Sequence, residues 1–163
     1  IYSAPASLNA TFGSGNIIAG NVAIITQSGA LGVAMIGKTA IENIGLSAII
    51  SVGNKSDIDE TDLLTYLTHH EGTKTILMYI EGIKTGTKFV KALKQATRQK
   101  PVVVIKSGRS KRGAVAAASH TGSLAGADEI FEDIMQQCGV LRAESRHRTL
   151  FQKLRNKIFQ YCW

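Results

Sequence analysis

The sequence contains few of the residues that mark unusual architectures. Among its 163 residues are two prolines and two cysteines, and aromatic residues make up 6%. Cys138 and Cys162 form neither a CxxC pair nor a disulfide framework, which argues against a disulfide-stapled domain and favours a reducing, cytoplasmic setting. No apolar run approaches the roughly 18 residues of a membrane span, and the first residues lack the pattern of a signal peptide. We therefore expect a globular chain with no membrane partner.

Acidic residues are absent from one long stretch, and this explains the net charge of +7. Residues 84–112 hold 10 Lys or Arg and no acid, while residues 142–163 hold 6 Lys or Arg and 1 acid. The first 141 residues carry a net charge of only +2. An isoelectric point near 9.6 is compatible with nucleic-acid binding. Because the charge is concentrated in one stretch and one tail, we expect no nucleic-acid partner, and a nucleic-acid-binding module stays an alternative that rests on the isoelectric point alone.

Short β-branched runs alternate with amphipathic stretches along the chain. The runs predict strands at residues 22–26, 46–52, 75–80, 101–105 and 139–141, and the stretches predict helices near 30–43, 59–71, 85–98 and 125–137. We expect Gly45 to cap the first helix and the last helix to bury Ile130, Phe131 and Ile134. Lys84, Lys88, Lys91 and Lys94 are expected on a solvated helix face. The alternation predicts an α/β fold, a flavodoxin-like three-layer sandwich with a five-stranded parallel sheet in the order 2-1-3-4-5.

Ligands of open α/β sheets bind beyond the carboxyl ends of the strands. The residues that follow the predicted strands are Gln27–Ala30, Gly53–Asn54, Glu81–Gly82 and Lys106–Gly108, with a long small-residue loop over 107–124. Loops of this length are usually functional or mobile. All of these residues are expected along one edge of the sheet.

Two predicted helix starts carry small residues, and both are candidate phosphate sites. Ser28, Gly29 and Ala30 form the first, and Thr121, Gly122 and Ser123 form the second. The free N–H groups and positive end of a helix favour an anion. The alternative for the first is an ordinary N-cap serine followed by a glycine that lets helix and strand pack closely.

His120 and Glu81 are the candidate catalytic residues. His120 lies beside the second helix start, and Glu81 ends an apolar strand, where a carboxylate needs a partner or water. A surface histidine and a solvated strand-end acid are the alternatives. As a pair they have a mechanism: a carboxylate that accepts from one imidazole nitrogen leaves the other as a nucleophile. There is no HExxH, cysteine cluster or P-loop, and no metal site is expected.

Five motifs together resemble those of the NDP-forming acyl-CoA synthetases, which include the ADP-forming acetyl-CoA synthetases and succinyl-CoA synthetase. The resemblance runs over about residues 8–141 in order. The motifs are ITQSGALG at 25–32, SVGN at 51–54, YIEG at 79–82, VIKSG at 104–108 and SHTGSLAG at 119–126.

The resemblance implies specific roles for the candidate residues. His120 matches the histidine that is phosphorylated during turnover, and Glu81 matches the glutamate that orients and stabilises it. Ser28–Ala30 and Thr121–Ser123 match the two helix starts that face the phosphohistidine. The implied reaction is that of an acid–CoA ligase, which couples interconversion of acyl-CoA and acyl phosphate to ADP and ATP.

The resemblance also implies other domains. We expect residues 1–20 to be a linker from a CoA-binding Rossmann-like domain, residues 21–142 to be the flavodoxin-like domain, and residues 143–163 to be a basic divergent tail. The implied partners are that CoA-binding domain and an ATP-grasp domain or β subunit, with acyl-CoA, phosphate, CoA, ATP or ADP and Mg²⁺ used by the full enzyme, which is expected to be an oligomer. No cofactor is expected to bind this domain tightly.

Two alternatives stay open at this point. The tail is a docking helix, a frameshifted end, a cloning artefact or a basic membrane-surface helix, because Leu150, Leu154 and Ile158 recur at helical spacing. The whole domain is alternatively a non-catalytic regulatory module of the kind fused to protein acetyltransferases. In such modules the histidine is typically replaced, so His120 argues against this alternative.

Overall fold

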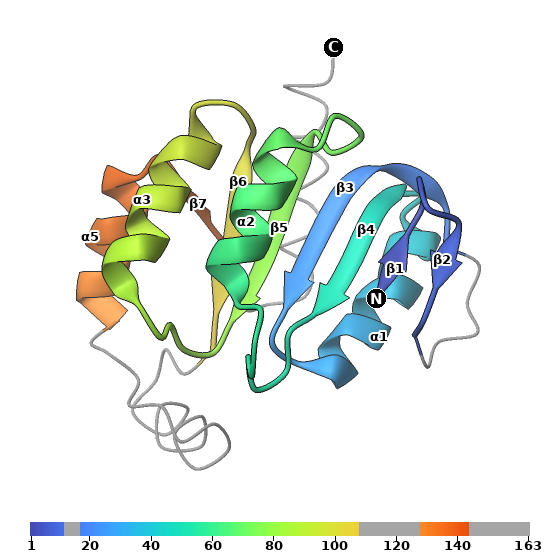
Figure 1. Cartoon of the computed structure of the whole chain (residues 1–163), viewed down its shortest axis with the longest axis horizontal. Helices are drawn as coiled ribbons and strands as arrows, with labels where there is room; N and C mark the ends of the chain where they lie inside the picture. Colours follow the sequence, from blue (N-terminus) through green and yellow to red (C-terminus); the bar gives the residue numbers. More distant parts are fainter. Residues whose placement is uncertain (12–16, 108–127, 144–163) are drawn as a thin grey trace.

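The computed structural model describes residues 1–11, 17–107 and 128–143, which form one mostly parallel sheet with helices on both faces (Figure 1). The helices are α1 (Gly29–Ile41), α2 (Glu60–His69), α3 (Gly86–Thr97) and α5 (Asp128–Gln137). The seven strands are β1 (Tyr2–Ser3), β2 (Leu8–Asn9), β3 (Ala19–Thr26), β4 (Leu46–Ser51), β5 (Thr75–Ile80), β6 (Val102–Lys106) and β7 (Leu141–Arg142). None of these helices has the length and apolar character needed to cross a bilayer.

The strand order β2-β1-β4-β3-β5-β6-β7 contains the predicted parallel order as its last five members. β3 pairs in parallel with β4 and with β5, and β6 pairs in parallel with β5 and with β7. The flavodoxin-like architecture is therefore confirmed, but the predicted number of five strands is wrong. The sheet has seven strands because residues of the segment expected to be a linker add two short antiparallel strands, with Tyr2 opposite Ile49 of β4. β1 pairs with the edge of β4 that the parallel strands leave open, and β2 pairs with the outer side of β1.

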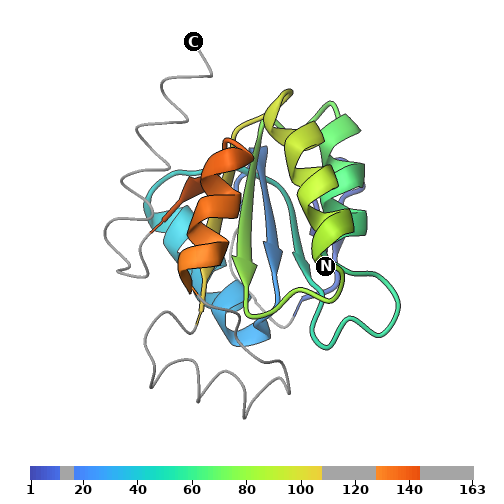
Figure 2. The same cartoon turned by 90° about the vertical axis from the view of Figure 1, so that its left-hand side faces the viewer.

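The helices divide between the two faces of the sheet as right-handed crossovers require. The step from β3 to β4 runs in one direction along the sheet, and the steps to β5, β6 and β7 run in the other. α1 accordingly packs with Ile24, Ile49 and Leu77 on one face, whereas α2, α3 and α5 pack on the opposite face. Figure 2 shows α1 across the sheet from α2 and α3.

Two local expectations are wrong. Ile130 is 62% exposed, because the buried stripe of α5 and the turn after it runs through Phe131, Met135 and Cys138, with Ile134 partly buried beside it. Gly45 does not cap α1, since the residue of positive φ after the cap at Glu42 is Asn43, at 54°. Gly45 instead lies against Gly20 so closely that a Cβ added to Gly20 would come within 2.5 Å of its backbone.

Candidate functional site

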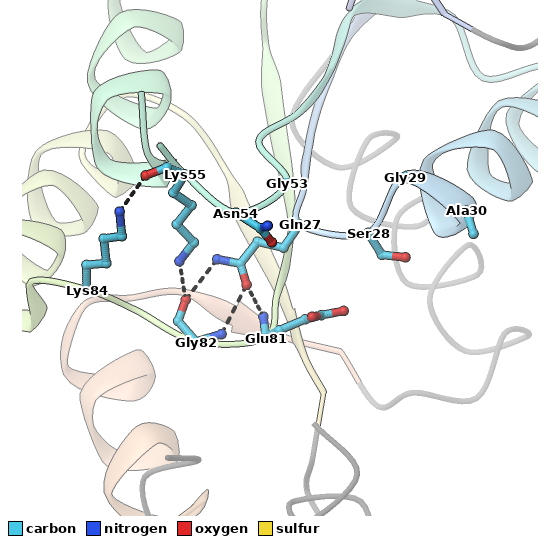
Figure 3. Close-up of a pocket in the computed structure, with 10 residues that line it drawn as sticks. All are labelled: Gln27, Ser28, Gly29, Ala30, Gly53, Asn54, Lys55, Glu81, Gly82 and Lys84. Atoms are coloured by element: carbon cyan, nitrogen blue, oxygen red, sulfur yellow. Dashed lines mark hydrogen bonds between the residues drawn. The ribbon is translucent and has the colours of Figure 1, made fainter. Parts of the chain in front are cut away.

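The carboxyl ends of β3, β4 and β5 surround a hollow of about 360 Å³ (Figure 3). Three of the four described segments predicted to share this edge contribute to the hollow. Its lining consists of Gln27, Ser28, Gly29, Ala30, Gly53, Asn54, Lys55, Glu81, Gly82 and Lys84. The rule that ligands of open parallel sheets bind at these strand ends thus leads to a real cavity.

Ser28 is the N-cap of α1, as the alternative for this residue predicted. Its hydroxyl accepts a hydrogen bond from the N–H of Leu31 at 3.3 Å. The preceding Thr26 holds the turn from strand to helix, because its hydroxyl donates to the carbonyl of Ser28 at 2.9 Å. Gly29 and Ala30 line the hollow, and the first N–H groups of a helix have no partner within it.

Gly29 does not serve the close packing that the same alternative assigned to it. A Cβ added at Gly29 would meet nothing within 4 Å. The glycine that lets α1 approach the sheet is Gly32, whose added Cβ would lie 3.2 Å from the side chain of Thr26. A Cβ at Gly32 would therefore press on Thr26 where helix and sheet meet, whereas the space in front of Gly29 is open.

Glu81 comes directly after β5 and is half-buried in the wall of the hollow. Its side chain extends towards the Ser28 end, away from Lys55 (Figure 3). Burial raises the pKa of the Tyr79 phenol above its usual value, and the neighbouring negative charge of Glu81 raises this pKa further. Tyr79 therefore stays a neutral phenol beside the carboxylate at physiological pH.

Gln27 connects the two walls of the hollow, a role that the sequence did not indicate. Its carboxamide oxygen accepts hydrogen bonds from the N–H groups of Glu81 and of Gly82, the second at 3.0 Å. Its carboxamide nitrogen donates to the carbonyl of Gly82 at 2.8 Å (Figure 3). The turn that carries Glu81 is thus fixed from the start of α1.

Lys55 and Glu60 form a buried ion pair behind this turn. Their nitrogen and oxygen atoms lie 2.9 Å apart, and the two side chains are 9% and 1% exposed. The ammonium of Lys55 also donates to the carbonyl of Gly82. Neither residue carries a signal in the sequence, because an isolated Lys and the first acid of a helix are both ordinary surface residues.

Lys84 is exposed, as predicted, but it does not lie on the helix. It precedes α3, lines the hollow, and its ammonium donates to the carbonyl of Lys55. Lys88, Lys91 and Lys94 are exposed on α3, as predicted. The two lysines at the hollow are therefore engaged with its backbone.

The second half of the predicted site lies outside the described residues. This applies to His120 and to Thr121, Gly122 and Ser123, so their roles stay predictions. Within residues 1–11, 17–107 and 128–143, no three His, Cys, Asp or Glu side chains gather as metal ligands would. The described half of the site offers helix N–H groups for an anion and a carboxylate for an N–H donor.

The chain was compared with known families and proteins. The model of the family described as "Succinyl-CoA ligase like flavodoxin domain" matches residues 19–153. Subunit alpha of the ADP-forming acetate–CoA ligase I of Pyrococcus furiosus is 55% identical over 139 residues, which are 85% of this chain and 30% of that protein. The ADP-forming acetate–CoA ligase of Methanocaldococcus jannaschii is 45% identical over 137 residues, 84% of this chain and 19% of that protein.

A solved structure is similar to most of the chain. The dinucleotide-forming acetyl-coenzyme A synthetase 1 of Ca. Korarchaeum cryptofilum, in complex with phosphate and ADP, superposes with a TM-score of 0.84 at 50% identity. The match covers 88% of this chain and 32% of that one, so the chain spans about a third or less of the proteins it resembles. On the sequence match and the shared fold together, the chain belongs to the family of succinyl-CoA ligase like flavodoxin domains.

Proposed function

We propose that this chain is the phosphohistidine-carrying domain of an ADP-forming acid–CoA ligase. The observation that carries the proposal is the hollow in which Glu81 and the open start of α1 meet. An acid and a helix start in one cavity are what a phosphorylated imidazole requires, since the acid holds the ring and the helix holds the phosphoryl group. The relatives named as ADP-forming acetate–CoA ligases support the choice of reaction.

The proposed chemistry moves one phosphoryl group through His120. Inorganic phosphate attacks the acyl carbon of acyl-CoA, which breaks the carbon–sulfur bond and yields acyl phosphate and CoA. One imidazole nitrogen of His120 then attacks phosphorus, the bond between phosphorus and the acyl oxygen breaks, and the carboxylate departs. Glu81 accepts the N–H of the other imidazole nitrogen, which stabilises the charge on the ring. Transfer from His120 to ADP gives ATP.

The N–H groups of Gly29 and Ala30 bind the phosphoryl oxygens in this scheme. Preorganised donors at a helix start stabilise such charge because they do not need to reorganise. Thr121–Ser123 are proposed to supply the second set of donors. No residue described here is assigned to Mg²⁺, which we propose accompanies the nucleotide on another domain.

The remaining domains and partners are part of the same proposal. The chain covers 30% of its Pyrococcus relative, which leaves room for a CoA-binding domain, and that relative is named as one subunit. An ATP-grasp domain or β subunit would then bring ADP to His120, in an oligomeric enzyme of the cytoplasm. The buried free thiol of Cys138 suits a reducing compartment.

A domain exchange tests the proposal. Residues 19–153 would replace the matching segment of the Pyrococcus subunit alpha, and the chimera would be assembled with the rest of that enzyme. Incubation with γ-³²P-labelled ATP should give acid-labile protein label, and His120→Asn should abolish it. His147→Asn serves as the matched control and should retain the label. Label that persists in His120→Asn refutes the proposal, and a folded chimera that never labels favours the regulatory module.

A further inference from the structure

We propose that Gln27 is a positioning residue that fixes the turn carrying Glu81 and so sets the direction in which its carboxylate enters the hollow. The inference rests on the proposed function, because it assigns the means by which the site aims its acid. It concerns a side chain that neither the motif resemblance nor the relatives assign to a role.

The backbone hydrogen-bond ladder between β3 and β5 ends just before Glu81. Thr26 pairs with Tyr79, and the N–H of Gln27 still donates to the carbonyl of Tyr79 at 3.2 Å. From Ser28 onward the main chain of β3 turns away to begin α1. The backbone of Glu81 and Gly82 therefore has no strand of β3 beside it.

The side chain of Gln27 makes the hydrogen bonds to Glu81 and Gly82 that the next peptide group of β3 would have made. Its oxygen faces the two N–H groups of the turn, and its nitrogen faces the carbonyl of Gly82 (Figure 3). A carboxamide has the same acceptor and donor as a peptide, so it extends the ladder past Glu81. An apolar side chain of the same length offers neither bond.

The carboxamide of Gln27 is held in one orientation by its surroundings. Glu60 accepts from the same nitrogen at 3.4 Å, and Lys55 donates to the same Gly82 carbonyl. Because Glu60 is buried and ionically paired, the amide cannot turn its oxygen towards it without repulsion. Gln27, Lys55 and Glu60 thus fix the turn at Glu81 and Gly82. The conformation of this turn sets the direction of the Cα–Cβ bond of Glu81.

Removal of these bonds should misplace the carboxylate without removing it. Displacements of about 1 Å in a catalytic constellation can cost up to about 100-fold in rate. We therefore expect Gln27→Met to slow the labelling of His120 at saturating ATP by about 10- to 100-fold. The concentration of ATP for half-maximal rate should not change, since the substitution acts on phosphoryl transfer and not on nucleotide binding.

A double-mutant cycle in the assembled chimera separates positioning from a structural effect. The labelling rate is measured for Gln27→Met, for Glu81→Gln and for the double variant. If Gln27 acts through Glu81, its loss adds nothing once the carboxylate is gone, and the double variant labels at the rate of Glu81→Gln. Gln95→Met, on the exposed face of α3, is the matched control and should label as the parent does.

Gln27→Asn covers the case in which Gln27→Met does not fold. It keeps a neutral carboxamide near Glu60 but is one methylene shorter and so loses the reach to Glu81 and Gly82, and the same absence of an added effect with Glu81→Gln is expected. Multiplicative losses in the double variant, or parent-like labelling of Gln27→Met, overturn this inference and leave the proposed function intact. A parent chimera that is folded yet never labelled overturns the proposed function, and this inference with it.

Discussion

The buried ion pair behind the hollow gives a stability prediction that follows directly from its geometry. Lys55→Met removes the cation and leaves the carboxylate of Glu60, which is 1% exposed, without its partner at 2.9 Å. Loss of one member of a buried pair costs about 3–5 kcal/mol, because the remaining charge stays desolvated. For a domain of this size 1 kcal/mol corresponds to about 2–4 °C, so the unfolding midpoint should fall by about 6–20 °C.

Urea unfolding followed by circular dichroism measures the loss of free energy, and thermal unfolding measures the fall in the midpoint temperature. Lys38→Met is the matched control, since Lys38 pairs with Glu42 at 2.6 Å with both side chains about one-third exposed. Exposed pairs of this spacing contribute about 0.3–0.5 kcal/mol. The double variant Lys55→Met/Glu60→Met should be more stable than Lys55→Met, because it removes both charges. A cost for Lys55→Met no larger than that for Lys38→Met would show that burial does not strengthen the pair of Lys55 with Glu60.

Three further predictions concern glycines and one buried lysine. Gly20→Ala should destabilise the fold strongly in urea unfolding, because its Cβ would meet the backbone of Gly45 at 2.5 Å, whereas Gly37→Ala, with open space around it, should stabilise by about 0.5–1 kcal/mol; equal effects would contradict the contact. Gly29→Ala should leave the free energy of unfolding within about 0.5 kcal/mol of the parent, because its Cβ meets nothing within 4 Å. It should slow labelling of the chimera, because the added methyl group enters the proposed phosphate site, and unchanged labelling would exclude Gly29 from that site. Burial lowers the pKa of Lys106, so the unfolded chain binds more protons between the folded and unfolded pKa values and stability should rise with pH across that window; Lys106→Met should reduce this rise in urea titrations from pH 7 to 10, and a parallel pH dependence would refute it.

The central strands could be predicted because their sequences need no partner to be recognised. β3, β5 and β6 are buried on both faces, so each appears as a continuous apolar run, and the order follows from alternation and right-handed crossovers. β1 and β2 have two residues each and no such pattern. β1 forms because the edge of β4 offers unpaired backbone groups, and β2 forms on β1, so both depend on the assembled sheet.

In the described half of the candidate site, the sequence predicted where Ser28 and Glu81 lie along the chain and at which edge of the sheet. The positions of Ser28 and Glu81 follow from the ends of their strands, and the hollow contains both. Gln27, Lys55 and Glu60 could not be assigned, because their contacts join residues 33 and 27 positions apart in the chain. A buried charge is identified by its burial, and burial of a single Lys or Glu is not encoded in the local pattern.

The charges around the hollow also change the meaning of the basic composition. Lys55 is neutralised by Glu60 and directed at Gly82, and Lys84 is bonded to the backbone of Lys55. Lys55 is therefore engaged with Glu60, whereas the exposed Lys84 keeps its charge, and the described part of the hollow also presents the N–H groups at the start of α1. Their partial charge lies at a fixed point and has one direction, unlike the diffuse field of the exposed lysines on α3. The proposed phosphate site is therefore defined by the helix end and not by the overall excess of basic residues in the sequence.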